Sequence, residues 1–445
     1  MDKPTYIDDK LLDKIAGAKY VHIVTIGTKP DIIKQAPIYH ELKKKGEVVI
    51  LCHTGQHYDY NYSGGVEEEF GLEVDIRLAI DGGLSEKTAQ MIERFGKIIY
   101  YLLERGITPI PYVHGDTSTA SAIAYSSMIH RVACVHVEAG IRTITPKRSV
   151  YQLFYSQFKK GKFDWDEYYS AVQDIDNFTR GSMEPYPEQV NTRMIEPASG
   201  FYATPVNLTR DFLIKEGFDE SRIEVVGNTV ADVTLQAIKD AAKSDIFSHY
   251  PQLEDGHFIM MSIHRRENIL DESRFLKIIE LVEKIVAGGD KLLFLSLLGT
   301  ESAIDAFNLR GKIDELREKY PNEFIYSAAW PFHRDIIAAM QKCSLVVSDS
   351  GGFQEEANIV GVPNVTIRFG SDRGESFIAG ANVPAPPIDS GFMYEIVKGA
   401  IDNRSMRQVG NIYGENVARR IVDEVLERLD PENGFYITEE KRLGF

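Results

Sequence analysis

A glycine turn within residues 345–363 combines the features of a phosphate-binding site. The segment reads as an apolar strand, a turn containing Ser350, Gly351 and Gly352, and the start of a helix. Two adjacent glycines let backbone N–H groups approach an anion, and the helix start adds the positive end of its dipole. These features predict a diphosphate site, although an N-capped helix in any α/β fold would have the same pattern.

The helix after this turn is expected at residues 353–360, with Glu355 and Glu356 in its first turn. A carboxylate there complements the helix dipole. It also lies within reach of the hydroxyls of a ribose attached to the diphosphate, so this pair supplies a candidate ribose contact.

Basic residues follow other strands of the same half of the chain. His264 and Arg265 come directly after one predicted strand, and Arg373 follows another. The whole chain carries a formal charge of −16, so a phosphorylated ligand needs a local basic pocket. Charge-assisted contacts from these groups to phosphate oxygens are strong enough to provide one.

Two carboxylates stand at the ends of successive strands in the first half. Asp116 follows the strand expected at residues 111–113, and Glu138 follows the strand expected at residues 132–137. Both are expected at the carboxyl edge of one sheet, where open parallel sheets bind ligands. Converging carboxylates have pKa values pushed apart by repulsion and burial, which suits acid–base chemistry. Asp116 has an alternative role, since it can cap the helix that follows.

Further polar residues lie at strand ends in the first half. Lys29 and Lys34 lie in and just beyond a second glycine turn, at residues 27–31, which is another anion-receptive arrangement. Gln56 follows the next strand, and Arg142 lies four residues beyond the carboxylate at position 138. We expect these four side chains to bind substrate.

Strands and helices alternate along the chain, which predicts an α/β protein of two Rossmann-like domains facing a central cleft. The first, residues 1–232, carries the carboxylates, and the second, residues 233–410, carries the diphosphate site. Residues 411–445 hold an amphipathic helix that we expect to pack back on the first domain. No GxGxxG, Walker A, HExxH or GxSxG motif is present, so we expect no bound dinucleotide cofactor and no serine hydrolase.

Residues of about 144–184 follow a different pattern. They predict two amphipathic helices, at residues 150–162 and 164–180, which form an aromatic-rich helical insertion in the first domain. The aromatic residues are Tyr151, Phe154, Tyr155, Phe158, Phe163, Trp165, Tyr168, Tyr169 and Phe178. An aromatic stripe at helical spacing is more typical of a core or a subunit interface than of a ligand site.

Composition limits the partners. The chain has 445 residues and a pI near 5.2, which argues against nucleic acid or an anionic membrane as the main partner. No apolar run approaches membrane-spanning length, so we expect no membrane insertion and a cytoplasmic protein. Three cysteines without metal-ligand spacing are expected to be buried apolar residues, and no metal site is predicted.

Eight segments, in this order and spacing, resemble the UDP-N-acetylglucosamine 2-epimerase family, which has a GT-B-like fold. They are GTKPDIIKQAP (27–37), TGQH (54–57), HGDTSTA (114–120), HVEAGIRT (136–143), PEQVN (187–191), GNTVAD (227–232), HRREN (264–268) and DSGGFQEEA (349–357). The resemblance covers nearly the whole chain except the insertion. It implies epimerisation at C2 of a UDP-2-acetamido sugar by elimination and re-addition of UDP, without a cofactor, in a homodimer.

The resemblance also implies roles for single residues. The family's catalytic carboxylates are matched by Asp116, Glu138 and Glu188, and its histidine near the diphosphate is matched by His264. Binding roles fall to Lys34, Ser350, Gly351, Gly352 and Glu356.

Three of the chain's departures from the family pattern concern the substrate site. Lys29 and Asp31 stand in the segment that usually reads GTRPE, so a bidentate arginine contact becomes a point charge. Ile336 falls where an aromatic contact to uracil is expected, and Phe332 is near enough to substitute. The insertion is far longer than the family's loop, which approaches the sugar, and it is therefore expected to alter substrate choice.

Other functions remain open. A hydrolysing 2-epimerase would release N-acetylmannosamine and UDP, although the KPDIIKQAP segment resembles the non-hydrolysing branch more closely. A GT-B glycosyltransferase could use the insertion as an acceptor platform, but three carboxylates exceed its need for one base. A sugar-nucleotide sensor would bind UDP without turnover. The sugar itself is either N-acetylglucosamine or a modified 2-acetamido relative.

Overall fold

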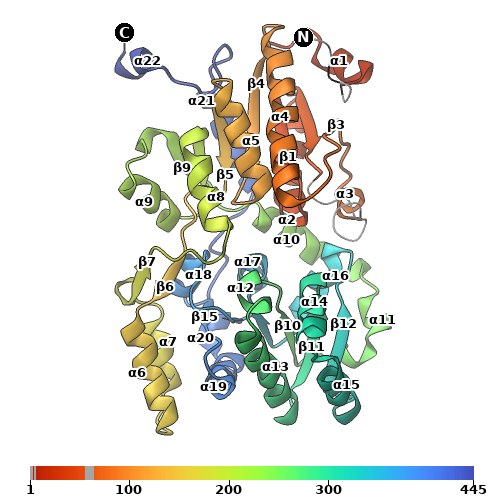
Figure 1. Ribbon diagram of the computed structural model, residues 1–445, viewed down its shortest axis with the longest axis vertical. Helices are drawn as coiled ribbons and strands as arrows, with labels where there is room; N and C mark the ends of the chain where they lie inside the picture. Colours follow the sequence, from red (N-terminus) through yellow and green to blue (C-terminus); the bar gives the residue numbers. More distant parts are fainter. Residues whose placement is uncertain (1–3, 5–6, 56–64, 445) are drawn as a thin grey trace. The chain divides into compact units, whose positions relative to one another are not determined.

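The protein is described here from a computed structural model, in which residues 4, 7–55 and 65–444 are described. The chain divides into two compact units (Figure 1). Unit 1 consists of Met1–Ile141, Pro187–Val233 and Tyr413–Phe445, and unit 2 consists of Arg142–Tyr186 and Thr234–Ile412. No helix in the described part of the chain is long and apolar enough to cross a membrane.

Unit 1 is built on a parallel sheet with strand order β3-β2-β1-β4-β5-β8-β9. The strands are β1 (Tyr20–Ile26), β2 (Val49–His53), β3 (Ile76–Arg77), β4 (Thr108–His114), β5 (Cys134–Val137), β8 (Ser199–Thr204) and β9 (Ile223–Val225). The helices are α1 (Asp9–Ile15), α2 (Lys29–Lys44), α3 (Gly65–Glu69), α4 (Leu84–Leu103), α5 (Ser118–Ile129), α8 (Glu188–Ile195), α9 (Asn207–Lys215), α21 (Val417–Arg428) and α22 (Glu439–Leu443). Helices α4 and α5 lie side by side and pack against the sheet at β4 (Figure 1).

Unit 2 has its own parallel sheet, with strand order β12-β11-β10-β13-β14-β15. The strands are β10 (Phe258–Ser262), β11 (Lys291–Ser296), β12 (Phe324–Ala328), β13 (Leu345–Ser348), β14 (Asn364–Thr366) and β15 (Asn382–Pro384). The helices around it are α11 (Ile246–His249), α12 (Arg266–Ile269), α13 (Glu272–Ala287), α14 (Leu298–Ala306), α15 (Arg310–Lys319), α16 (His333–Lys342), α17 (Gly351–Val360), α18 (Gly374–Ile378), α19 (Ser390–Ile401) and α20 (Arg404–Arg407).

The central strands of both sheets are buried along nearly their whole length. Strand β1 reads YVHIVTI and strand β13 reads LVVS. Continuous apolar runs of this kind suit parallel strands that are covered on both faces. The two sheets thus confirm the expected Rossmann-like architecture, and each has a carboxyl edge for polar loops.

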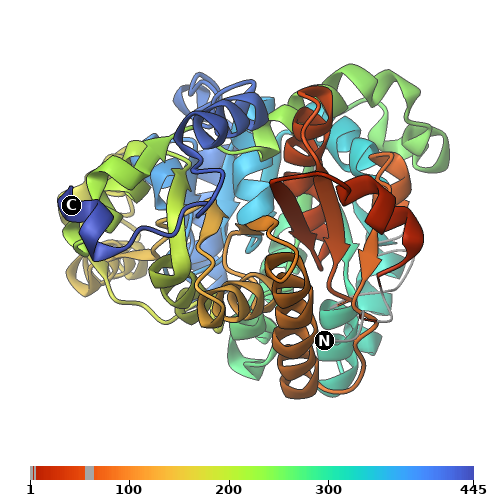
Figure 2. The same ribbon diagram turned by 90° about the horizontal axis from the view of Figure 1, so that it is seen from above.

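The C-terminal segment, dark blue in Figures 1 and 2, belongs to unit 1. The side chain of Asp232 accepts hydrogen bonds from the backbone N–H groups of Val417 (3.0 Å) and Ala418 (2.8 Å). These are N-terminal donors of α21 that lack a partner within the helix. Asp232 therefore fixes the start of α21, which packs against α2.

The insertion differs from its expected form. It contains β6 (Ile144–Pro146), α6 (Arg148–Lys159), α7 (Trp165–Ala171), a short 3-10 helix (Ile175–Asn177) and β7 (Phe178–Arg180). The expected helix at residues 164–180 ends at Ala171, because the chain then turns back and β7 pairs antiparallel with β6. Both predicted helices are present, but the second has only 7 residues and is followed by a 3-10 helix of 3 residues and a strand of 3 residues.

The insertion also belongs to unit 2 rather than to the first domain in which the sequence places it. Its aromatic side chains explain this. Phe163 and Tyr168 pack around Phe392 of α19, and the Tyr168 hydroxyl donates a hydrogen bond to the Pro384 carbonyl oxygen at the end of β15 (2.6 Å). Chain order gave no sign of these contacts, which span more than two hundred residues of sequence.

Candidate active site

In unit 1 the ends of β4 and β5 carry a buried cluster centred on Glu138. The Glu138 Oε2 atom accepts hydrogen bonds from Lys34 Nζ (2.5 Å), His114 Nε2 (2.8 Å) and Asn228 Nδ2 (3.1 Å). All four residues are buried. Three donors on one oxygen stabilise the carboxylate anion, so Glu138 is held in its charged form.

His114 joins Glu138 to a second carboxylate. Its Nδ1 atom lies 3.3 Å from Asp31 Oδ1, and Asp31 also completes a capping box with Thr28 at the start of α2. Burial alone would lower the pKa of His114, but the charge of Glu138 and hydrogen bonds to Asp31 and Glu138 raise it to about 9. The imidazole is therefore a buried cation at neutral pH, with a proton on each ring nitrogen.

Glu138 and Lys34 were expected at this site from the sequence, whereas His114, Asp31 and Asn228 were not. The signal for His114 was present, since it ends the same strand from which Asp116 follows. The contact with Glu138 was not visible, because the two residues belong to neighbouring strands 24 positions apart. Asp31 and Asn228 contact residues 83 and 90 positions away in the sequence, and only the folding of the chain brings them together.

Asp116 lies on the turn after β4 and Glu188 on α8, and one hydrogen bond connects these two segments. The Asn191 side chain, on α8, donates a hydrogen bond to the Asp116 carbonyl oxygen (2.9 Å), and Glu188 is the first residue of the same helix. Thr117, not Asp116, caps α5. The capping alternative for the Asp116 side chain is therefore wrong, and its carboxylate remains a candidate for chemistry.

Two further predicted residues of unit 1 have different outcomes. Lys29 is partly exposed. It is the first residue of α2, directly after the Thr28 cap, so the helix begins three residues earlier than the turn at residues 27–31 led us to expect. Gln56 lies outside the described residues.

In unit 2 the glycine turn is part of a helix. The Ser350 side chain accepts a hydrogen bond from the backbone N–H of Phe353 and caps α17, which begins at Gly351. The helix therefore starts two residues before the expected position. Glu355 and Glu356 consequently lie in the second turn, not the first, and the expected interaction with the helix dipole is wrong.

Each of these glutamates has a specific partner instead. Glu355 Oε1 accepts a hydrogen bond from Arg373 Nε (2.5 Å), and Glu356 Oε1 lies 2.9 Å from His333 Nε2. Glu356 lies on α17 as expected, but one of its two carboxylate oxygens already contacts His333.

Asp349 organises the loop that follows β10. Its buried carboxylate accepts hydrogen bonds from the backbone N–H groups of His264 (2.9 Å) and Arg265 (3.0 Å) and from the Asn268 side chain (3.0 Å). Asp349 directly precedes Ser350. Two neighbouring residues of one turn therefore cap α17 and fix the backbone of His264 and Arg265. The sequence analysis missed this role of Asp349.

Three arginines surround the buried carboxylate of Asp372. Arg368 Nη1 lies 2.5 Å, Arg373 Nη1 3.1 Å and Arg265 Nη2 3.9 Å from its oxygens. Burial would raise the pKa of Asp372, but the three guanidinium charges hold it well below its usual range. Two further carboxylates contact the same arginines, because Glu355 Oε1 lies 2.5 Å from Arg373 Nε and Glu267 Oε1 lies 3.5 Å from Arg368 Nε. Arg265, Arg368 and Arg373 therefore belong to an ion-pair network with three carboxylates.

Arg265 and Arg373 of this network lie beside the start of α17. A Cβ atom on Gly351 would lie 3.3 Å from Arg265 Nη2, 3.4 Å from Asp372 Oδ2 and 3.7 Å from Arg373 Cζ. Arginine side chains and a helix N-terminus in one place form an anion site. The structure therefore brings Ser350, Gly351, Arg265 and Arg373 together, and diphosphate binding at this place stays a prediction.

The remaining predicted positions of unit 2 are placed as follows. Arg142 is buried, with 2% of its surface exposed. Ile336 packs in the hydrophobic core of unit 2, whereas Phe332, at the start of α16, is half-buried with the Arg334 guanidinium 4.4 Å from its ring centroid. Phe332 is thus better placed than Ile336 for an aromatic contact.

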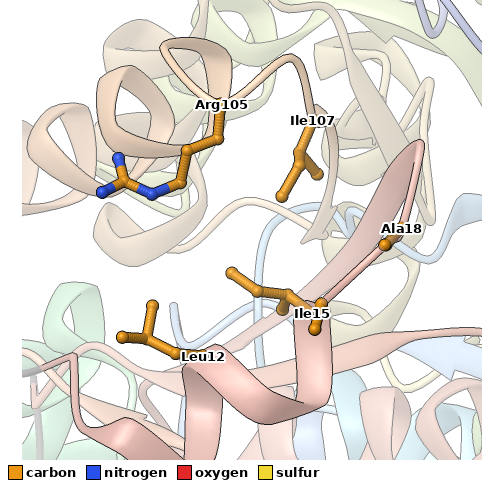
Figure 3. Close-up of a pocket in the computed structure, with 7 residues that line it drawn as sticks. Leu12, Ile15, Ala18, Arg105 and Ile107 are labelled. Atoms are coloured by element: carbon orange, nitrogen blue, oxygen red, sulfur yellow. The ribbon is translucent and has the colours of Figure 1, made fainter.

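A pocket of about 340 Å³ in unit 1 lies away from all these residues (Figure 3). It is lined by Leu12, Ile15, Ala16, Gly17, Ala18, Arg105 and Ile107. These residues precede β1 and β4, so the pocket lies at the amino edge of the sheet. Ligands of open parallel sheets bind at the carboxyl edge, and this pocket holds no acid–base pair.

Solved structures share this fold. The UDP-GlcNAc 2-epimerase of Methanocaldococcus jannaschii in complex with UDP-GlcNAc and UDP has a TM-score of 0.74 and 25% identity, covering 92% of this chain and 99% of that chain. The enzyme from Neisseria meningitidis bound to UDP-GlcNAc has a TM-score of 0.71 at 22% identity, covering 92% and 100%, and supports the fold alone. The protein is thus a GT-B-like α/β protein with two Rossmann-like units.

The sequence comparisons define the family within this class. The family model described as UDP-N-acetylglucosamine 2-epimerase matches residues 40–150 and 179–427. A protein of this name from M. jannaschii is 29% identical over 366 residues, 81% of this chain and 87% of its own length. Another, from Bacillus subtilis, is 28% identical over 424 residues, 92% and 96%. The chain belongs to the UDP-N-acetylglucosamine 2-epimerase family.

Residues 151–178, which separate the two matched stretches, contain most of α6, all of α7 and the first residue of β7. The family model thus omits the aromatic core of the insertion. This part of the chain is an addition to the framework that the family shares.

Proposed function

We propose that this protein epimerises a UDP-2-acetamido sugar at C2 without net hydrolysis. The observation that carries the proposal is the chemistry of the two clusters: the buried carboxylate of Glu138 beside two cations in unit 1, and arginines at a helix start in unit 2. Relatives named UDP-N-acetylglucosamine 2-epimerase, and structures of such enzymes with UDP-GlcNAc, support the choice of substrate class.

In the proposed reaction the sugar loses UDP and then regains it. A base removes the C2 proton, the C1–O bond breaks with its electron pair on the β-phosphate oxygen, and a C1=C2 double bond forms in a 2-acetamidoglucal. A proton then returns to the opposite face of C2 while the UDP oxygen bonds to C1 again. Charge on the leaving diphosphate is stabilised by Arg265, Arg373 and the α17 N-terminus.

The carboxylates have different tasks in this scheme. Glu138 is the poorer base, because three hydrogen-bond donors stabilise its anion. Its charge is suited to stabilising the positive charge that develops at C1. Asp116 and Glu188, whose segments are joined by the hydrogen bond from Asn191, are the candidates for proton transfer on the two faces.

Two minor assignments complete the proposal. Glu356 contacts the ribose, and His264 and Lys34 contribute positive charge near the diphosphate and the sugar. We also propose that the protein is a homodimer, as the exposed large apolar side chains of α4 and α5 favour a partner surface. They are Leu84, Tyr100, Leu103, Tyr125, Met128 and Ile129.

Incubation with UDP-N-acetylglucosamine in D2O tests the reaction. The expected result is deuterium at C2 of the recovered nucleotide sugar, together with the C2 epimer, by mass spectrometry and NMR. Free N-acetylmannosamine with stoichiometric UDP would instead establish the hydrolysing reaction. Neither product, in the presence of measurable UDP binding, would refute epimerase activity on this sugar and leave the transferase or sensor.

A further inference from the structure

The loop at residues 369–374, which carries Asp372 and Arg373, is held on one side by the insertion. The Tyr151 hydroxyl on α6 donates a hydrogen bond to the Phe369 carbonyl oxygen (2.6 Å), and the two rings pack edge to face. Burial raises the pKa of Tyr151 well above its usual range, so the hydroxyl keeps its proton. The contact joins the insertion to the first residue of the loop.

The strand β6 holds the next residues of the same loop. Ile144 and Ser371 exchange both backbone hydrogen bonds, each of 3.0 Å. A Cβ atom on Gly370 would lie 2.3 Å from Thr145 Oγ1 and 2.5 Å from the Ile144 carbonyl oxygen. Since real Cβ atoms do not approach so closely, only glycine fits at this position, and the loop and β6 form one tightly packed layer.

On its other side the loop is attached to the helix of the anion site. The Ser371 hydroxyl donates a hydrogen bond to Gln354 Oε1 on α17 (2.6 Å) and accepts one from the Arg373 backbone N–H (2.8 Å). The same Gln354 oxygen accepts a hydrogen bond from Asn382 of β15 (3.0 Å). Ser371 therefore connects β6, Arg373 and α17 in a buried network.

We infer that the insertion is a positioning element for the arginines of the anion site, and that Tyr151 is its key positioning residue. By fixing Phe369 and Ser371, it holds Arg373 and Asp372 beside Gly351, and through Asp372 it holds Arg265. Tyr151 lies outside the residues that the family model matches, so this support belongs to the added segment. The inference rests on the proposed function only in taking the anion to be a nucleoside diphosphate.

This role differs from the one expected from sequence, where the insertion was to alter the choice of sugar. Its described contacts reach the loop of the arginines, α19 and β15. The structure therefore assigns the insertion to diphosphate affinity.

The test compares Tyr151→Phe with Tyr169→Phe in the full chain. Tyr169 also donates its hydroxyl to a backbone oxygen of unit 2, that of Gly380 (2.8 Å), but outside the loop. Binding of UDP and of uridine, which lacks the diphosphate, is measured by calorimetry or competition NMR. We expect Tyr151→Phe to weaken UDP binding about fivefold, the range of one lost hydrogen bond, and to leave uridine binding unchanged. Tyr169→Phe should bind both ligands as the wild type does.

A second variant protects the test from ambiguity. Gly370→Ala drives a Cβ atom into β6, and it should lower UDP affinity more strongly than Tyr151→Phe while Tyr169→Phe stays unaffected. Equal UDP affinity in wild type and Tyr151→Phe, an equal loss of UDP and uridine binding, or no UDP binding by the wild type would each overturn the inference. C2 exchange in D2O is followed in parallel: a wild type that binds UDP without exchange refutes the proposed reaction alone.

Discussion

Replacing His114 with glutamine tests whether a buried cation holds the carboxylates of unit 1. The imidazole contacts Asp31 through Nδ1 and Glu138 through Nε2. Glutamine is of similar length and can still donate one hydrogen bond, but it carries no charge. The change therefore removes the charge while keeping most of the packing.

The size of the effect follows from the pKa of His114, which is raised from 6.5 to about 9. A group whose folded-state pKa is raised stabilises the fold fully below its unfolded pKa, and this stability is lost as pH rises through the folded pKa. At about 1.4 kcal/mol per pKa unit, the protonated ring contributes about 3 kcal/mol at pH 6, about 2 kcal/mol at pH 7.5 and less than about 0.5 kcal/mol at pH 9.

Urea unfolding at these three pH values measures the effect. Both tryptophans, Trp165 and Trp330, belong to unit 2, so their fluorescence reports unit 2, whereas far-UV circular dichroism reports both units. The loss on His114→Gln should appear in the dichroism transition and be absent from the fluorescence transition. It should be largest at pH 6 and nearly vanish at pH 9.

A pH-independent difference between wild type and variant would refute the reasoning, because it would mean that the ring stabilises unit 1 by packing alone. A difference that grows from pH 6 to pH 9 would show that the ring is neutral when buried. Either outcome would also contradict the view that a charged His114 stabilises the Glu138 anion.

Three further predictions concern the site and its surroundings. Asp116→Asn and Glu138→Gln should each lower C2 exchange at least about a hundredfold with UDP affinity within about twofold of wild type, and a parallel loss of UDP binding would contradict the assigned roles. Gly352→Ala should leave the melting temperature equal or higher, because its Cβ meets only Ser350 Oγ at 3.8 Å and alanine favours helix. UDP affinity should nevertheless fall about tenfold, because the added methyl group keeps the diphosphate from approaching the backbone N–H groups. Unchanged affinity would place the diphosphate elsewhere. Ile129→Glu on α5 should convert the dimer to a monomer in light scattering, and a wild-type monomer would refute the proposed dimer.

The sequence predicted the polar residues at strand ends well, because their positions follow from strand and turn patterns alone. Asp116, Glu138 and Arg265 lie at the carboxyl ends of β4, β5 and β10, as expected from local signals. What could not be predicted is which of them touch. The contact between His114 and Glu138 depends on the pairing of β4 with β5. The contact between His114 and Asp31 depends on the position of the start of α2 beside the end of β4.

The start of α17 shows a second kind of limit. Two glycines favour a turn by propensity, so the helix was expected to begin after them. The Ser350 side chain caps the helix from the residue before both glycines, and serine is one of the preferred N-cap residues. The two glycines are therefore the first two residues of the helix. A two-residue error in the boundary was enough to assign Glu355 and Glu356 to the wrong turn.

The packing of Trp165 shows how unit 2 is adapted to the insertion. Gly399 lies inside α19, where glycine costs about 1 kcal/mol relative to alanine. A Cβ atom there would lie 2.1 Å from Trp165 Cδ2, so the glycine makes room for the indole, which stacks on Tyr169 at 5.6 Å. Trp165 belongs to the segment that the family model omits. The glycine on α19 therefore has a physical reason only in the presence of the insertion.

This reasoning predicts a change of sign in a double-mutant cycle. Gly399→Ala should destabilise unit 2 in the wild-type chain by about 1–3 kcal/mol, the range for overpacking. In a Trp165→Ala background the same substitution should stabilise it by up to about 1 kcal/mol, because only helix propensity remains. Urea unfolding followed by the fluorescence of the unit 2 tryptophans, which is that of Trp330 alone in the Trp165→Ala background, measures both backgrounds. An equal effect of Gly399→Ala with and without the indole would show that α19 tolerates alanine there and that the glycine is not an adaptation to the insertion.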